Sequence, residues 1–176
     1  MNVGIKLAVH DKASLLRSVV LSANDGIITT FAIVTGSLGA SLSPTVVLIL
    51  GFANLFADGF SMATGNYLGI KSEIELEKKE GQNISIGNKP MKNGIITFFS
   101  FVVAGFVPLF PYVLKLKNSF VFSCVLVAIT LIVVGFIRGV YTGKNKLKIA
   151  TENLIIGGLA AVVAYGVGFL VDKYLI

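Results

Sequence analysis

A row of polar side chains runs through residues 51–72, an apolar segment long enough to cross a bilayer. Asn54, Asp58, Met62 and Asn66 recur in this segment at four-residue spacing. On an α-helix this spacing forms one slowly drifting face, because residues i and i+4 are neighbours. An Asp at mid-helix costs about 2.5 to 3.5 kcal/mol to insert, so the face is expected to meet a protein interior or a hydrated path. The row predicts ion handling inside a membrane, and its thioether adds a soft ligand for a transition metal.

A second carboxylate, that of Asp25, lies in an earlier apolar segment beside Asn24, Thr29 and Thr30. Thr29 follows it by four residues and therefore shares its helical face. We favour an ion or proton site here, since packing alone gives no reason for an acidic group in such a segment. The alternative is an Asp that pairs with a Lys or Arg near the inner surface.

Each member of the polar row also has a structural interpretation. Asp58 has no basic residue within its own segment, so it either couples protons and binds metal or holds a proton and hydrogen-bonds a neighbouring helix. Met62 either packs in a core or binds metal with Asp58, and a carboxylate with a thioether suits Fe²⁺ better than Mg²⁺ or Ca²⁺. Asn54 and Asn66 either supply neutral oxygens or join helices by hydrogen bonds.

Acidic residues follow this segment, and Glu73, Glu77 and Glu80 share a helical face. They either form an inner vestibule that gathers cations or make a solvated helix end balanced by Lys78 and Lys79. The candidate metal ligands from the sequence are Asp25, Met62, Asp58, Asn54, Glu73 and Glu77. No catalytic residue and no bound cofactor are predicted, since P-loop, HExxH, paired CxxC and nucleophile-elbow motifs are absent.

The composition is that of a polytopic helical membrane protein. Of the 176 residues, 55% are hydrophobic and 14% charged, and the mean hydropathy is +0.85. A net charge of +6 could indicate a nucleic-acid partner, but the basic residues lie in loops between apolar segments, where membrane topology explains them. We therefore expect a lipid bilayer as partner and no nucleic acid.

The hydropathy pattern predicts an all-α integral membrane protein, a single domain of residues 1–176 with five transmembrane helices. The expected spans are residues 17–40, 44–70, 94–114, 119–141 and 153–171. Residues 71–93 form the sizeable link, between the second span and the third.

Local signals place several helix ends. Ser43 is a suitable N-cap and Pro44 a suitable first residue for the second helix. That helix is expected to continue past the bilayer as a charged extension and to stop at Gly81. Pro108 and Pro111 are expected to kink or unwind the end of the third span.

The charge distribution predicts the orientation. With the N-terminus inside, twelve basic residues fall on inner segments, and Lys115, Lys117 and Lys173 fall on outer ones. Such a bias is a strong positive-inside signal. We expect a cytoplasmic N-terminus and, after five spans, a C-terminus outside or in a lumen.

The chain shows no convincing internal repeat, and five spans cannot form two equal inverted halves. A two-fold oligomer would supply a central path instead. Gly65 and Gly69 form a GxxxG motif, and Ala53, Ala57 and Ser61 extend a row of small residues. We expect a homodimer, although Gly and Ala are also simply common in spanning helices.

Several segments carry a resemblance to a known family. They are ANDGIITTFAIVTGSLGA (23–40), GFANLFADGFSMATGNYLGIKSE (51–73), FVVAGFVPLFPYVL (101–114) and ENLIIGGLAAVVAYGVGFLV (152–171). In content, order and spacing they resemble the vacuolar iron transporter family. The resemblance implies five spans and a homodimer with the ion path at the subunit interface, lined by Asp25 and Met62. It also implies export of Fe²⁺, and sometimes Mn²⁺, from the cytosol into a vacuole or outward in exchange for protons.

The chain departs from that pattern in two ways. Asn54 stands where some members carry a glutamate, and we infer that Asp58 takes over its charge. Such members also have a long acidic helical domain between the second and third spans that gathers metal, whereas only residues 71–93 join those spans here.

Together these patterns favour a transporter that moves divalent transition metal, Fe²⁺ first and Mn²⁺ second, out of the cytosol through a cell membrane or a vacuole-like organelle membrane. The alternative is a non-transporting membrane module that binds metal or a partner. An intramembrane aspartyl protease would use Asp25 and Asp58, but FADGF around Asp58 lacks the GxGD form of such enzymes.

Overall fold

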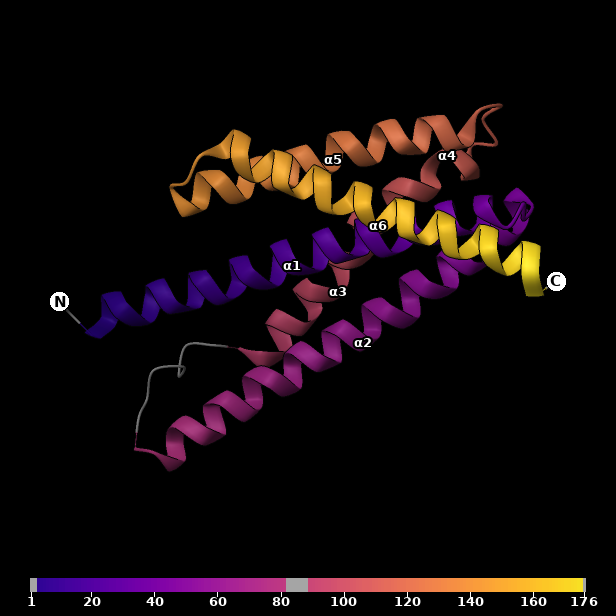
Figure 1. Cartoon of the computed structure of the whole chain (residues 1–176). Coiled ribbons are helices and arrows are strands. Elements are labelled where there is room, and N and C mark those ends of the chain that lie inside the picture. The colour runs from indigo at the N-terminus through magenta and orange to yellow at the C-terminus, as the bar shows by residue number, and fades with distance from the viewer. Residues whose placement is uncertain (1–2, 82–88, 176) are drawn as a thin grey trace.

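The computed structural model describes residues 3–81 and 89–175, with side chains from residue 12 onward (Figure 1). Its elements are α1 (Val3–Gly39), α2 (Pro44–Lys79), α3 (Pro90–Phe106), the 3₁₀ turn η1 (Val107–Leu109), α4 (Phe110–Val113), α5 (Ser119–Thr142) and α6 (Lys146–Leu175). Within these residues, five segments are long and apolar enough to cross a membrane: Lys12–Gly39, Pro44–Lys79, Pro90–Val113, Ser119–Thr142 and Lys146–Leu175. The predicted all-α class with five such segments is confirmed.

Helix α1 lies at the centre of the bundle and packs against α2, α3, α5 and α6. Helices α2 and α3 pack together on one side of it, and α5 and α6 pack together on the other (Figure 1). Buried side chains of α1, among them Ile27 and Val34, form the core with Phe101 and Leu131. Because α1 is surrounded in this way, the polar groups along it face other helices.

Helices α1 and α3 approach so closely that their backbones touch. A Cβ atom added at Gly26 would lie 2.5 Å from the carbonyl oxygen of Phe101, and one added at Gly105 would lie 2.8 Å from the carbonyl oxygen of Gly26. A glycine at each crossing position removes this clash. The contact fixes the part of α1 that carries Asp25, the residue before Gly26.

The third span breaks where its prolines predict. Helix α3 ends at Phe106, the chain tightens into η1 around Pro108, and the short helix α4 follows with Pro111 near its start. A proline lacks the N–H that continues an α-helical ladder. The hydroxyl of Ser123 on α5 donates to the carbonyl oxygen of Pro108 at 2.8 Å, which satisfies a backbone group within the break.

Helix α2 is bounded as expected. Ser43 is its N-cap residue, although the hydroxyl makes no capping hydrogen bond, and Pro44 is its first residue. The chain turns off at Gly81 with a φ of +69°, a value that glycine adopts without strain. With 36 residues, α2 is about 54 Å long. It therefore extends well past a hydrocarbon layer of about 30 Å.

The link and the last span differ in detail from the expected ranges. Of the link at 71–93, residues 71–79 belong to α2, α3 begins already at Pro90, and residues 82–88 lie outside the part of the chain that the structure describes. Helix α6 begins at Lys146 and not at 153. The side-chain oxygen of Asn145 accepts the N–H groups of Leu147 and Lys148 at 3.1 and 3.2 Å, so this asparagine caps an earlier start.

Candidate functional site

The hairpin of α1 and α2 brings the two intramembrane carboxylates together. Residues 40–43 join the helices, which run antiparallel, so Asp25 on α1 and Asp58 on α2 belong to neighbouring, packed helices and interact electrostatically. Both side chains are half-buried, and within the described residues neither forms an ion pair with a Lys or Arg. Two carboxylates in this position repel each other unless a proton or a cation lies between them.

Met62 opens on a polar cavity of about 400 Å³ between α1, α2 and α3. We call it the α1–α2 cavity; it is lined by Ser14, Arg17, Ser18, Leu21, Met62, Gly65, Asn66, Gly69, Ile70, Glu73 and Thr97. Met62 also packs against the hydrophobic core. The packing interpretation of Met62 fits these contacts, and metal binding by its thioether stays a prediction that its position at the cavity permits.

Asn66 joins three helices at the edge of this cavity. Its Nδ2 donates to Ser18 Oγ on α1 at 2.9 Å and to Thr97 Oγ1 on α3 at 2.7 Å. Ser18 and Thr97 are buried. The structural interpretation of Asn66, a hydrogen bond between helices, is the one that the structure supports.

Asn54 is in a different situation, one turn from Asp58 on α2. Its Nδ2 is buried and has no hydrogen-bond partner in the described structure. The two ends of a carboxamide exchange by rotation about the terminal bond, so this side chain can present either N–H groups or an oxygen. Asn54 therefore has an unused hydrogen-bond donor one turn from Asp58. In contrast, the Nδ2 group of Asn66 already donates to Ser18 and Thr97.

The acidic residues of the α2 extension do not act alike. Glu73 lines the α1–α2 cavity at the end nearest the charged extension of α2, the position expected for a residue of the inner vestibule. Glu75 forms an ion pair with Lys71 at 4.0 Å, which fits a solvated helix end. Glu77 is half-buried one turn beyond Glu73. Within the described residues, no three His, Cys, Asp or Glu side chains approach closely enough to hold a metal ion.

Sequence reasoning missed the face of α1 that completes the cavity. Ser14, Ser18 and Ser22 follow one another at four-residue spacing, and Ser14 and Ser18 line the cavity. Ser18 donates to the carbonyl oxygen of Ser14 at 3.0 Å, and Ser22 donates to that of Ser18. The four-residue spacing that singles out the row on α2 is present here as well, and it was the available signal.

Comparison with known proteins shows similarity over most of the chain. The model of the VIT family matches residues 16–86 and 79–169. A vacuolar iron transporter of Toxoplasma gondii is 28% identical over 93% of this chain and 76% of its own length. Vacuolar iron transporter 1 of Oryza sativa subsp. japonica is 25% identical over 86% of this chain and 83% of its own. Vacuolar iron transporter homolog 4 of Arabidopsis thaliana is 27% identical over 93% and 87%.

These relatives differ in how much sequence they insert. The alignment with the Toxoplasma gondii protein extends over 230 residues, more than the 176 of this chain, whereas that with the Arabidopsis thaliana homolog 4 extends over 172. The two matched pieces of the family model meet at residues 79–86, next to the end of α2. A short link between α2 and α3 is therefore compatible with similarity along both flanking parts of the chain.

Proposed function

Because this chain belongs to the VIT family, whose members are transporters and not enzymes, we propose that it moves divalent transition metal, Fe²⁺ first and Mn²⁺ second, out of the cytosol. It is a multi-pass integral membrane protein. The relatives named vacuolar iron transporter favour iron as the cargo and a vacuole-like organelle membrane as its location. The metal is the transported substrate and not a resident cofactor.

The observation that carries this proposal is that α1 and α2 pack together with one acidic residue on each, Asp25 and Asp58, and with Met62 of α2 at the α1–α2 cavity. A divalent cation between two carboxylates removes their repulsion and is held by oxygen ligands. Met62, one turn along α2, supplies a softer sulfur ligand at the α1–α2 cavity, which continues toward Glu73. We infer a path that runs from Glu73 and Glu77 past Met62 to Asp25 and Asp58, with Asn54 beside the carboxylates.

The path is proposed to lie between two copies of the chain. Ala53, Ala57, Ser61 and Gly65 form an exposed row on α2. A Cβ atom added at Gly65 or Gly69 would meet nothing within 4 Å. Small residues on an otherwise unoccupied face allow two helix backbones to approach closely. A symmetric contact there would double the ligands that border the cavity.

Proton exchange follows from the chemistry of the same carboxylates. A metal ligand must be deprotonated, so each carboxylate binds either a proton or the metal well, and the two cargoes compete. With the positive-inside orientation, the end of the path at Glu73 faces the cytosol. Metal would then move toward an acidic lumen and protons would return.

Flux into proteoliposomes tests the proposal. Purified protein in vesicles with an acidic interior should take up Fe²⁺, held reduced by ascorbate, together with an alkalinisation of the interior. Asp25→Asn should lower the flux at least about tenfold, which corresponds to a rise of about 1.4 kcal/mol in the barrier to metal passage when this ligand is lost. Asp172→Asn, which changes an exposed carboxylate at the far end of α6, serves as the matched control.

Three outcomes separate the alternatives. Uptake that depends on Asp25 and on the pH gradient supports the proposed exchange. Metal binding without uptake would identify the non-transporting membrane module instead. A normal rate in the Asp25→Asn variant would remove this residue from the path.

A further inference from the structure

A second polar cavity lies on the other side of α1, between α1, α5 and α6. Its volume is about 510 Å³ and we call it the arginine cavity; it is lined by Ala13, Leu16, Arg17, Val20, Leu21, Asn24, Arg138, Thr142 and Asn153. The chain has fifteen basic residues, and Arg17 and Arg138 are its two arginines. Both arginines line this one cavity, from helices that are far apart in the sequence.

Arginine and lysine are not equivalent at such a position. A guanidinium group presents a planar fork of donors that matches the oxygens of a phosphate in pairs, whereas an ammonium group acts as a point charge. Within the described residues, neither Arg17 nor Arg138 forms an ion pair with a carboxylate. Their donors are therefore available to an anion from outside the chain.

Two carboxamides in the cavity have buried atoms without partners. Asn153 on α6 is only 3% exposed, and its Nδ2 makes no hydrogen bond in the described structure. Asn24 on α1 has a buried Oδ1 that likewise accepts none. A buried polar atom without a partner is costly. A ligand that accepts from Asn153 and donates to Asn24 would satisfy both, and a phosphate that carries a neighbouring hydroxyl group can do so.

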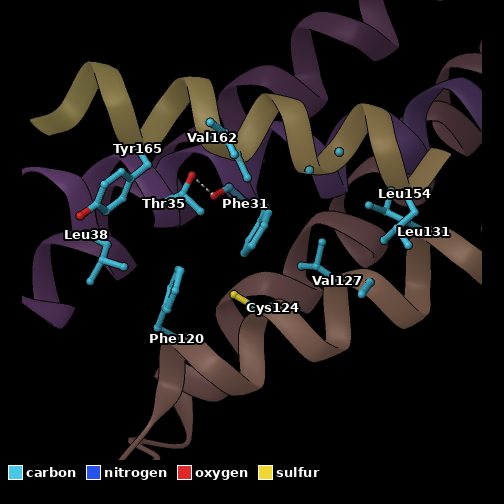
Figure 2. Close-up of a pocket in the computed structure, with 14 residues that line it drawn as sticks. Phe31, Thr35, Leu38, Phe120, Cys124, Val127, Leu131, Leu154, Val162 and Tyr165 are labelled. Atoms are coloured by element: carbon cyan, nitrogen blue, oxygen red, sulfur yellow. Dashed lines mark hydrogen bonds between the residues drawn. The ribbon is translucent and has the colours of Figure 1, made fainter. Parts of the chain in front are cut away.

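An apolar cavity of about 630 Å³ follows along the same three helices (Figure 2). It begins on α6 at Leu154, the residue after Asn153, and Phe31 on α1 with Val127 on α5 points into it. Its lining is almost wholly apolar, with Thr35 donating to the backbone of its own helix at 3.0 Å. A molecule with a polar head at the arginines thus finds an apolar surface further along the same three helices, which a free phosphate would not use.

We propose that the arginine cavity binds the headgroup of an anionic phospholipid in which the phosphate is flanked by hydroxyl groups, with an acyl chain along the apolar cavity of α1, α5 and α6. Arg17 and Arg138 hold the phosphate, and Asn153 donates to it. Asn24 accepts from a headgroup hydroxyl. The site lies on the side of α1 that faces α5 and α6, and Arg17 also borders the α1–α2 cavity, which Glu73 lines.

Lipid titration of the purified full-length protein tests this assignment. In detergent, phosphatidylglycerol should raise Tm and remain bound in native mass spectra, whereas phosphatidylcholine with the same acyl chains should do neither. Arg138→Gln and Arg138→Lys should both retain phosphatidylglycerol about tenfold less well, because each loses the paired donors of the guanidinium group. Lys148→Gln removes a charge near the same end of α6, outside the cavity, and should behave as wild type.

Asn153→Leu distinguishes loss of lipid binding from loss of folding. Replacing an amide whose buried Nδ2 has no partner by an apolar side chain of similar size should leave the lipid-free Tm unchanged or raise it. The shift caused by phosphatidylglycerol should nevertheless fall. This opposite response is not expected from a purely structural asparagine.

Other results would overturn the proposal. Equal retention of phosphatidylglycerol by wild type, Arg138→Gln and Lys148→Gln would mean unspecific attraction to a basic surface. A Tm shift by glycerol 3-phosphate as large as that by phosphatidylglycerol would assign the cavity to a soluble phosphate. An absence of any shift in the wild type would exclude a phosphate site.

Discussion

Asp25 and Asp58 are adjacent acids on adjacent helices, in a part of the chain where charge is poorly solvated. The pair is therefore least stable when both groups are ionised and empty. Protonation relieves the repulsion, and so does a bound cation. Two ways of relieving the same repulsion exclude each other, and this competition is the physical basis of the exchange that we propose.

Removal of one charge should consequently stabilise the fold while it impairs transport. Asp58→Asn keeps the size of the side chain and ends the repulsion with Asp25. We expect the metal-free Tm to rise, because the repulsion between the two carboxylates ends. Fe²⁺ flux should fall severalfold. Thermal denaturation in detergent measures the expected rise in Tm, and proteoliposome flux on the same preparation measures the expected fall in transport. A fall in both Tm and flux would instead indicate a structural role for Asp58.

Met62 should set selectivity more than rate. Its thioether prefers softer ions, so Met62→Leu should lower the flux of Fe²⁺ relative to that of Mn²⁺ by a few-fold while it preserves packing against the core. Competition between the two metals in proteoliposomes gives this ratio. Met91→Leu is the matched control, because Met91 is 64% exposed on α3. An unchanged ratio in Met62→Leu would leave Met62 as a packing residue.

The sequence could identify the polar row on α2 but could not divide its members by role. Asn54 and Asn66 are the same residue type on the same helix, and both interpretations stayed open for each. The difference depends on the partners that other helices bring: Ser18 and Thr97 accept from Asn66, and no acceptor reaches Nδ2 of Asn54 in the described structure. Spacing within one helix carries no information about such partners.

At the scale of elements, Asn66 connects α2 to both α1 and α3. Asn66→Leu would leave the buried hydroxyls of Ser18 and Thr97 without this donor, and we expect a loss of about 1–2 kcal/mol in unfolding free energy. Thr64→Val on the same helix should be nearly neutral, since Thr64 bonds only to the backbone of α2. Unfolding by denaturing detergent compares the two variants, and equal stabilities would contradict the connecting role of Asn66.

Helix ends were predictable where a single residue dictates backbone geometry. Pro108 interrupts the third span and Gly81 ends the turn after α2, as their conformational preferences require. The start of α6 was placed too late, because hydropathy reports the apolar part of a helix and not its polar first turns. Asn145 was the cue to the earlier start, since asparagine is among the preferred N-cap residues.

At the scale of the whole molecule, α1 separates two polar regions with different character. The side toward α2 and α3 carries the carboxylates and the α1–α2 cavity, and the side toward α5 and α6 carries the arginine cavity. Arg17 lies on α1 between them and borders both. An occupied headgroup site would thus neighbour the vestibule end of the metal path, so that lipid composition and transport can be measured together in one set of vesicles.

Gly65 and Gly69 on α2 line the α1–α2 cavity, but no backbone contact within one copy of the chain requires a glycine at either position. Gly26 and Gly105 are needed because backbones touch there, whereas Gly65 and Gly69 face open space. Glycine in the middle of a helix weakens it by about 0.8–1.0 kcal/mol relative to alanine. A second copy packed against this face would account for their presence, because only small residues let two helices approach at van der Waals distance.

Gly65→Leu tests this contact directly. A Cβ atom added at Gly65 meets no atom of its own chain within 4 Å, and leucine favours the helix more than glycine does, so the thermal stability of an isolated protomer should stay the same or rise. The bulky side chain should hold the two copies apart and lower both the dimer fraction and the Fe²⁺ flux about tenfold or more, since the path would lose the ligands of its second half. Gly166→Leu on α6, where an added Cβ also meets nothing, controls for the substitution itself. Single-molecule photobleaching in lipid vesicles gives the dimer fraction, and a Gly65→Leu protein that remains dimeric and active would place the interface on another face of the bundle.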